Sequence, residues 1–324
     1  MIDLPPPPKF LIDPPRIIRP DEGLMEATDR RMKLLGLDRA VRRVMLSETR
    51  NVVADLEAGK KPVLRDVIVR RIGNPLLASM LVNPFVYGGG VATDPSIANV
   101  VLLLGFEGAN NSTTLTDESP AAHGSGTVNG DAHIDTAQFK FGSSSGKFDT
   151  SGDYWSWADS NDWRLSTANS DTFTIEFWIR PNGTASNASV MGQAAGFGSW
   201  AWYIDRTETG TPTYAMTFNW SVNGTVLQTL NLGVVGLTSG AWHYIAISKN
   251  SSGKIRSWYN GNFGNSVTPA DSSMFNSTAA FELGRALATT GLNAWLDEVR
   301  ITKGVCRYDT DGSISVPTAA FPRS

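Results

Sequence analysis

Cysteine is almost absent from this 324-residue chain, which contains only Cys306. An internal disulfide is therefore excluded, and the fold cannot depend on an oxidising compartment. Long apolar runs are also missing, because the longest, residues 76–82 and 100–106, are too short to span a membrane. The first residues, Met-Ile-Asp followed by four prolines, do not have the pattern of a signal peptide. We expect a soluble protein that is made in a cytoplasm and does not insert into membranes.

Charge is nearly balanced overall, but the two parts of the sequence differ. The formal net charge is −3, yet residues 1–90 carry 15 Lys/Arg against 11 Asp/Glu, which leaves 13 against 20 for residues 91–324. The two parts are therefore expected to face different partners. The pairs Arg42-Arg43 and Arg70-Arg71 could contact nucleic acid. Such pairs more often form the solvated face of an amphipathic helix, so nucleic acid is not expected as a partner.

Residues 1–20 are rich in proline, with a run of four at positions 5–8. Proline fixes φ and favours extended backbone without internal hydrogen bonds, so we predict an extended arm with no core of its own. Such an arm is either disordered or docked onto another subunit. In the second case its apolar side chains would anchor the chain to a larger assembly. These side chains are Phe10, Leu11, Ile12, Ile17 and Ile18.

Helical patterning follows the arm, over residues 21–86. Apolar residues recur there at helical spacing, and Gly36 and Gly59 mark helix ends. We predict short α-helices that are marginally stable alone and act as an anchoring or assembly module. Residues 87–98, which include three consecutive glycines, are predicted to be a linker.

From residue 99 the composition changes to Ser, Thr, Asn, Gly and Trp, and the apolar pattern alternates. In residues 173–179, Phe and Ile alternate with Thr, Glu and Trp, which predicts a strand with one face in the core. Residues 214–222 alternate similarly, whereas residues 100–104 are apolar throughout, as in a strand buried on both faces. Asn223-Gly224 and Asn260-Gly261 are signals for type I′ hairpins. These features predict a mainly β fold, an antiparallel two-sheet sandwich over residues 99–324.

Several blocks of this region carry a family signature. They are FEG (residues 106–108), FGSSSGKFDTSGDY (141–154), DTFTIEFWIRP (171–181), AWHYIAISK (241–249), SWYNG (257–261) and AWLDEVRITKGVCRY (294–308). In this order they resemble the laminin-G-like and concanavalin A-like jellyroll domains, although Thr150 stands where the family usually has glycine. The last block, closed by the tail VPTAAFP (316–322), resembles the type found in bacteriophage virion proteins. Residues 1–90 resemble no family that we can name.

The resemblance implies a structural protein on the surface of a phage particle, synthesised in the host cytoplasm. It would be a head fibre, a capsid decoration or a tail-fibre-like protein, and a homo-oligomer such as a trimer. Residues 1–90 would bind other virion proteins of the capsid, portal, neck or tail, and the jellyroll would bind host cell-surface polysaccharide. A purely structural capsid-cementing or tail subunit is the alternative, and a polysaccharide depolymerase comes third.

Aromatic side chains in loop-rich stretches are the candidates for glycan binding, because flat rings stack on the C–H faces of sugars. Burial in the core is the alternative for each tryptophan. The candidates are Trp155, Trp157, Trp163, Trp200, Trp202 and Tyr203. No cofactor is required, but similar domains often hold Ca²⁺ at the rim. Their ligand positions correspond to Glu107 and Asp297, which are short of the six to eight oxygens that calcium takes.

Catalytic signatures are missing. Retaining glycosidases of this fold carry an E-x-D-x-x-E motif, which places two carboxylates about 5 Å apart, and the motif does not occur here. In the strand predicted at residues 294–303, alternation puts Asp297 and Glu298 on opposite faces, with Val299 and Ile301 on the side of Asp297. The three histidines lack metal-ligand spacing, and no G-x-S-x-G sequence is present. We therefore do not expect an enzyme.

Overall fold

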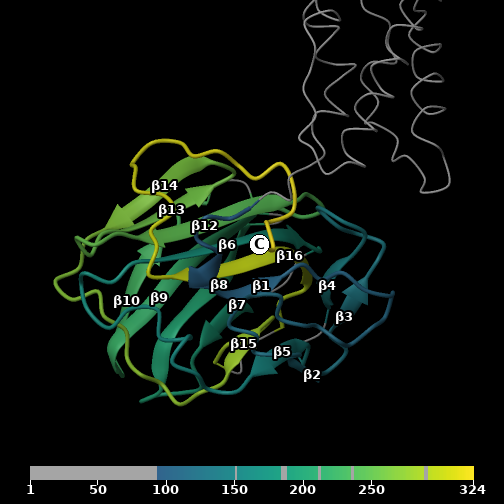
Figure 1. Cartoon of the computed structure of the whole chain (residues 1–324), viewed down its shortest axis with the longest axis horizontal. Helices are drawn as coiled ribbons and strands as arrows, with labels where there is room; N and C mark the ends of the chain where they lie inside the picture. The colour runs from purple at the N-terminus through teal and green to yellow at the C-terminus, as the bar shows by residue number, and fades with distance from the viewer. Residues whose placement is uncertain (1–92, 150–151, 184–187, 211–212, 235–236, 288–290) are drawn as a thin grey trace, which may run out of the picture. The chain divides into compact units, whose positions relative to one another are not determined.

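The computed structural model describes residues 93–149, 152–183, 188–210, 213–234, 237–287 and 291–324. The chain divides into two compact units, Met1–Gly90 and Val91–Ser324, and the second is called the β domain below (Figure 1). No helix within the described ranges is long and apolar enough to cross a membrane. The predicted arm and helical module lie outside the described residues, as do the proposed anchoring residues Phe10, Leu11, Ile12, Ile17 and Ile18.

The β domain is a sandwich of two antiparallel sheets with eight strands each, which confirms the predicted fold class (Figure 1). Sheet 1 has the order β14-β13-β12-β6-β16-β4-β3, with β1 paired to β16. Its strands are β1 (Val100–Leu104), β3 (His133–Asp135), β4 (Ser145–Phe148), β6 (Phe173–Pro181), β12 (His243–Lys249), β13 (Ile255–Tyr259), β14 (Asn262–Val267) and β16 (Ala294–Lys303). Sheet 2 has the order β10-β9-β8-β7-β15-β5-β2, with β11 paired to β9. Its strands are β2 (Thr127–Asn129), β5 (Tyr154–Trp157), β7 (Ala188–Gln193), β8 (Trp200–Gly210), β9 (Thr213–Gly224), β10 (Leu227–Asn231), β11 (Leu237–Thr238) and β15 (Phe281–Leu283). A short 3-10 helix, η2 (Ile97–Asn99), precedes β1.

Alternation along β6 sorts its side chains as predicted. Its Phe and Ile residues at positions 173, 175, 177 and 179 lie in the core between the sheets, whereas Trp178 belongs to a second apolar cluster on the outer face of sheet 1. Strand β1 is buried along its whole length. It supplies Leu102 and Leu104 to the core, and Val100 and Leu103 to the outer cluster, as its continuous apolar run predicts.

The two predicted hairpin signals differ in outcome. Tyr259 pairs with Asn262, so Asn260 and Gly261 form a two-residue loop, and both have the positive φ that a type I′ turn requires (49° and 81°). The second hairpin is wider, because the pairing of β9 with β10 ends at Ser221 and Leu227. Its loop is held by the Asn223 side chain, which accepts hydrogen bonds from the backbone of residues 225 and 226.

Strand β16 departs from the alternation predicted for it. Its register against β6 shifts between Asp297 and Arg300, and Glu298 has a φ of 48°. This bulge inserts one extra residue, so Val299 and Ile301 point into the core. Asp297 accepts hydrogen bonds from the backbone of the loop at residues 140–141, and Glu298 accepts one from Phe321, so both carboxylates meet segments that lie on the outer face of sheet 1. The prediction that they face opposite sides was wrong.

The outer face of sheet 1 is covered by the C-terminal tail, residues 304–324. The tail, yellow in Figure 1, passes over β12–β14 and ends beside β16. Phe321 is buried in the apolar cluster there, and Tyr308, Ile314 and Val316 pack against the same cluster. The backbone carbonyl of Gly312 accepts a hydrogen bond from Trp258 Nε1 at 2.9 Å, which fixes the middle of the tail to β13.

Candidate functional site

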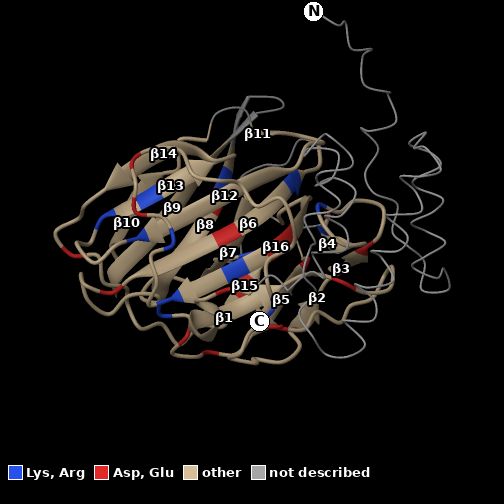
Figure 2. Ribbon diagram, turned by 45° about the horizontal axis from the view of Figure 1, so that its top comes forward, with Lys and Arg blue, Asp and Glu red and all other residues tan. Residues whose placement is uncertain are grey.

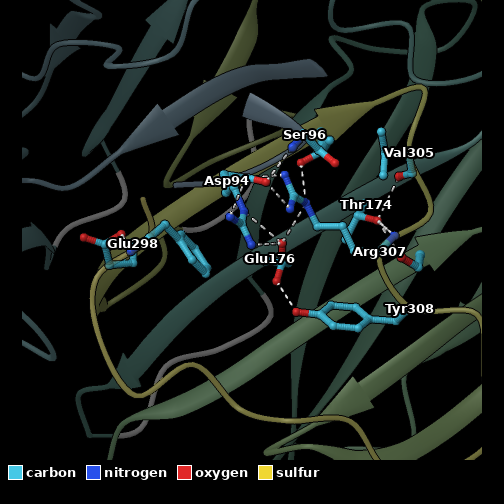
Figure 3. A network of polar contacts seen from close by, with 12 residues as sticks. Asp94, Ser96, Thr174, Glu176, Glu298, Val305, Arg307 and Tyr308 are labelled. Atoms are coloured by element: carbon cyan, nitrogen blue, oxygen red, sulfur yellow. Dashed lines mark hydrogen bonds and ion pairs between the residues drawn. The ribbon is translucent and has the colours of Figure 1, made fainter. Parts of the chain in front are cut away.

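A buried ion network on the outer face of sheet 1 joins both ends of the β domain to the sheet (Figure 3). The Arg300 guanidinium lies between the carboxylates of Glu176 (2.7 Å) and Asp94 (3.0 Å), and Arg307 from the tail also pairs with Asp94 at 2.6 Å. Tyr308 donates a hydrogen bond to Glu176. Burial raises the pKa of Asp94, but the hydrogen bonds from Arg307 and the Ser96 backbone, together with the charges of Arg307 and Arg300, outweigh burial and hold this pKa below its ordinary value. Figure 2 shows the opposite charges side by side on β6 and β16.

This network corrects one predicted boundary. The linker was predicted to extend to residue 98, but Asp94 is buried, and its backbone N–H donates a hydrogen bond to the carbonyl of Ser324. Residues from 93 onward therefore belong to the β domain. Every charge in the network has an opposite partner and the tail lies over it, so these charges are neutralised within the fold.

Four of the tryptophans proposed to bind glycan lie in the core. Trp155, Trp157, Trp163 and Trp202 are at most 4% exposed and belong to the cluster between the sheets. Their ring N–H groups donate to backbone carbonyls, as Trp202 does to Trp163 at 2.7 Å. These rings cannot stack on a sugar, so the core alternative holds for them. The pattern was ambiguous because Trp155 and Trp157 face inward together at spacing i, i+2, as on any half-buried strand.

Trp200 and Tyr203, in contrast, lie on the outer face of sheet 2. Strand β8 has a register shift against β9 between Trp200 and Trp202, and normal alternation after it turns Tyr203 away from the core. Tyr203 packs with Ala194 and Ala286, and Trp200 and Leu227 lie against the same small cluster. The stretch of β8 that sequence reasoning treated as one site thus contributes to both faces of the sheet.

Two neighbouring loops next to Tyr203 expose apolar side chains. Phe197 is 79% exposed and makes an edge-to-face contact with Trp200, with ring centroids 5.6 Å apart. Val226 is 60% exposed in the β9–β10 loop. The two loops are joined by a hydrogen bond from the Gly198 backbone N–H to the carbonyl of Gly224. We call Phe197, Trp200, Val226 and Leu227 the rim patch. Exposed groups of this kind mark interaction surfaces more often than isolated apolar side chains do.

A polar cluster continues from the rim patch across the outer face of sheet 2. Asp205 of β8 accepts a hydrogen bond from Ser189 Oγ at 2.6 Å, and Asn219 Nδ2 lies 3.5 Å from its other oxygen. The Asn219 amide is oriented by Thr229 Oγ1, which donates to its oxygen at 2.8 Å, and by Thr217 Oγ1, which accepts from its nitrogen at 3.0 Å. We call Ser189, Asp205, Thr217, Asn219 and Thr229 the polar cluster.

Desolvation sets the electrostatics of this cluster. Burial raises the pKa of Asp205, although the hydrogen bond from Ser189 partly opposes the shift. Burial and the neighbouring Asp205 charge raise the pKa of Tyr203 to about 12, so this hydroxyl keeps its proton at any physiological pH. Tyr203 is the register partner of Asn219 across β8 and β9, so it connects the cluster to the rim patch.

The proposed calcium ligands Glu107 and Asp297 do not form a site that fits calcium. Glu107 accepts hydrogen bonds from the backbone N–H and the hydroxyl of Ser143. One oxygen of Asp297 accepts from the backbone of Lys140 and Phe141, and burial raises the pKa of this carboxyl to about 7. Backbone N–H donors thus occupy positions that a cation would need, and the described residues contain no group of three or more His, Cys, Asp or Glu that could hold a metal ion.

Sequence reasoning missed Phe197, Asp205 and Asn219. Phe197 stands alone among Gly, Ala and Ser, a context that reads only as a loop. Asp205 and Asn219 did carry a signal, since each lies on an alternating strand opposite the apolar face. Asp205 is two residues from Tyr203, and strand geometry puts such residues on the same face.

Comparison with known proteins agrees with this architecture. Residues 148–307 match the family model of the concanavalin A-like lectin/glucanases superfamily, which confirms that the β domain is a laminin-G-like jellyroll. No curated protein matches the sequence. Similar solved structures include the binding domain of Paraclostridial Mosquitocidal Protein 1, with 13% identity, a TM-score of 0.49, and coverage of 66% of this chain and 50% of that chain. The binding domain of botulinum neurotoxin serotype D has 13% identity and a TM-score of 0.49, over 64% and 49% of the two chains.

A third similar structure is Domain 4 of AbnA, a GH43 extracellular arabinanase from Geobacillus stearothermophilus, in complex with arabinotriose. It has 16% identity and a TM-score of 0.46, over 64% of this chain and 94% of that chain. The chain spans about half the length of the two toxin domains that it matches. At these identities and scores the likeness concerns the fold and says nothing about the ligands of this chain.

Proposed function

We propose that the β domain, a jellyroll of the concanavalin A-like lectin/glucanases superfamily, binds carbohydrate on the outer face of sheet 2. One observation carries the proposal: an exposed aromatic rim is continuous with a desolvated cluster of a carboxylate, an amide and hydroxyls. Phe197 offers its ring to solvent, and Tyr203 links it to Asp205 and Asn219.

The chemistry of the two groups is complementary to that of a sugar. Pyranose rings have an apolar C–H face that stacks on aromatic rings, and hydroxyls at the edge that act as donors and acceptors. Phe197 and Trp200 would meet the apolar face. Asp205 would accept from one hydroxyl, and the oriented Asn219 amide and Thr229 would bind the next. Because their partners already orient these groups, little side-chain entropy is lost on binding.

The biological setting follows from the sequence resemblance alone. We propose a phage virion protein, a head fibre, capsid decoration or tail-fibre-like protein, whose residues 1–90 bind other virion proteins. Copies on one particle would combine weak individual sites into firm adhesion to host polysaccharide. The exposed rim patch also favours a second candidate, a cementing subunit in which Phe197 and Val226 pack against a neighbouring subunit. The depolymerase has less support, since Glu282, a second carboxylate described on this face, is paired in a bidentate manner with Arg285.

The test is binding of the full-length chain to a panel of bacterial surface polysaccharides by calorimetry or glycan array. We expect Phe197→Ala to weaken binding about tenfold, which corresponds to about 1.4 kcal/mol. Phe139→Ala is the matched control, because Phe139 is also exposed (44%) but lies in the loop at the outer face of sheet 1. Equal effects of both variants, or no binding to any glycan, would contradict the proposal. A lower oligomeric state for Phe197→Ala without a glycan effect would favour the cementing subunit.

A further inference from the structure

We infer that the surface on sheet 2 selects uncharged glycans, and that Asp205 is the residue that excludes acidic ones. This inference rests on the proposed carbohydrate binding and names its ligand class.

Among the described residues, the partners of Asp205 are neutral polar groups and include no cation. Its two oxygens contact the Ser189 hydroxyl at 2.6 Å and the Asn219 amide at 3.5 Å, and no ion pair to Asp205 occurs among the described residues. Hydroxyl and amide dipoles orient a carboxylate without cancelling its charge. The side chain is half-buried, so solvent screens this charge less than on an open surface.

The described arginines on β8 and just after β15 have other partners. Arg285 donates to both oxygens of Glu282 (3.0 and 2.6 Å) and lies over the Tyr154 ring, 3.6 Å from its centroid. Arg206 follows Asp205 on β8 but is fully buried, and donates to the backbone carbonyls of Leu292 and Asn293. Neither guanidinium offers the fork that binds a sugar carboxylate, sulfate or phosphate group.

The remaining groups suit hydroxyls. The Asn219 amide is held in one orientation by Thr229 and Thr217. Tyr203 is 5% exposed, and no hydrogen bond joins its hydroxyl to another described residue. Residues 91–324 also carry 13 Lys/Arg against 20 Asp/Glu, so the wider field of the domain repels anions. A ligand charge placed about 5 Å from Asp205 would weaken binding about 300-fold at an effective dielectric constant of about 20.

The experiment compares glycans that differ only in charge, using the full-length chain. One pair is methyl-esterified and de-esterified polygalacturonate, and another is dextran and dextran sulfate. Wild type should bind the neutral member of at least one pair, and bind its acidic partner at least tenfold more weakly at low salt. Asp205→Asn should bring the two affinities within about threefold of each other, with most of the change on the acidic member.

The matched control is Asp131→Asn. This variant removes the same charge from a side chain that is 80% exposed and lies in the β2–β3 loop, at the other edge of sheet 2 from β10. It should leave the discrimination of wild type in place. Thermal melts of each variant check that the fold is intact.

The possible outcomes separate this inference from the proposed function. If wild type prefers acidic glycans and Phe197→Ala loses this binding, the inferred ligand class is wrong but the proposed binding surface stands. Discrimination that Asp205→Asn and Asp131→Asn reduce equally would assign it to net charge and overturn the role of Asp205. Absence of binding to every glycan, charged or neutral, would overturn both.

Discussion

The outer faces of the two sheets carry similar residues but are in opposite states. On sheet 1 the carboxylates of Asp94 and Glu176 form ion pairs with Arg300 and Arg307, and the C-terminal tail covers this ion network. On sheet 2 the carboxylate of Asp205 contacts hydroxyl and amide groups and no cation among the described residues, and the apolar residues beside it extend to the exposed Phe197. A carboxylate closed by cations contributes to the integrity of the fold. A carboxylate held by neutral dipoles keeps its charge available to a ligand.

The two faces should differ most in the loss of free energy of unfolding that follows when one arginine is removed from each. Arg300→Met leaves Glu176 and Asp94 buried with a single arginine between them. Uncompensated buried charge costs about 3–5 kcal/mol, so we expect a loss of this size in the free energy of unfolding, measured in urea. Arg285→Met removes a cation from the pair with Glu282 on sheet 2, whose side chains are 22% and 16% exposed and so remain in contact with solvent, and should cost about 1 kcal/mol or less. Equal losses would show that the ion network is no more closed than a surface pair.

A second prediction concerns the carboxyl that loop 140–141 covers on sheet 1. Burial raises the pKa of Asp297 to about 7 from its ordinary value of 3.8. Between pH 4 and 7 the folded protein therefore holds a proton that the unfolded chain has released, and stability falls as the pH rises through this window. Asp297→Asn removes the cost of ionisation, so it should stabilise the protein by about 2 kcal/mol at pH 8, since three pKa units set a ceiling of about 4 kcal/mol.

The control for Asp297→Asn is the same variant at pH 4, where the wild-type carboxyl is protonated and resembles an amide. The free energies of unfolding of the two proteins, measured in urea, should then agree within about 0.5 kcal/mol. A stabilisation that persists unchanged at pH 4 would contradict ionisation as its cause.

The sequence predicted the sandwich well because its signal is local. Alternation along β6 and the Asn260-Gly261 turn depend on neighbours in the chain, and both are present as expected. The bulge in β16 is different. Glu298 takes a positive φ, which is rare for glutamate, and no local pattern of the sequence indicates it. One inserted residue was enough to place Val299 and Ile301 on the face opposite to Asp297, with which they were predicted to align.

The candidate site was predicted less well because burial depends on long-range pairing. Trp155 and Trp157 are buried through β15, whose residues Leu283 and Phe281 are paired with them from more than 120 positions away. Trp200 and Tyr203 remain outside because β8 shifts its register against β9. Aromatic residues in a loop-rich stretch therefore identify a region, and only the sheet order decides which of them face solvent.

The smallest expected effect is the gain in stability from neutralising Asp205 on sheet 2, compared with Asp297 on sheet 1. Burial raises the pKa of Asp205 as it does that of Asp297, so Asp205→Asn should also stabilise the protein at pH 8 and not at pH 4. Its side chain is half-buried and not fully desolvated, and it accepts a hydrogen bond from Ser189. We therefore expect a gain of less than about 0.5 kcal/mol in the free energy of unfolding. Urea unfolding of both variants at both pH values provides the comparison. A gain for Asp205→Asn as large as that for Asp297→Asn would mean that the face of sheet 2 is as closed as that of sheet 1, and a closed face could not receive a glycan.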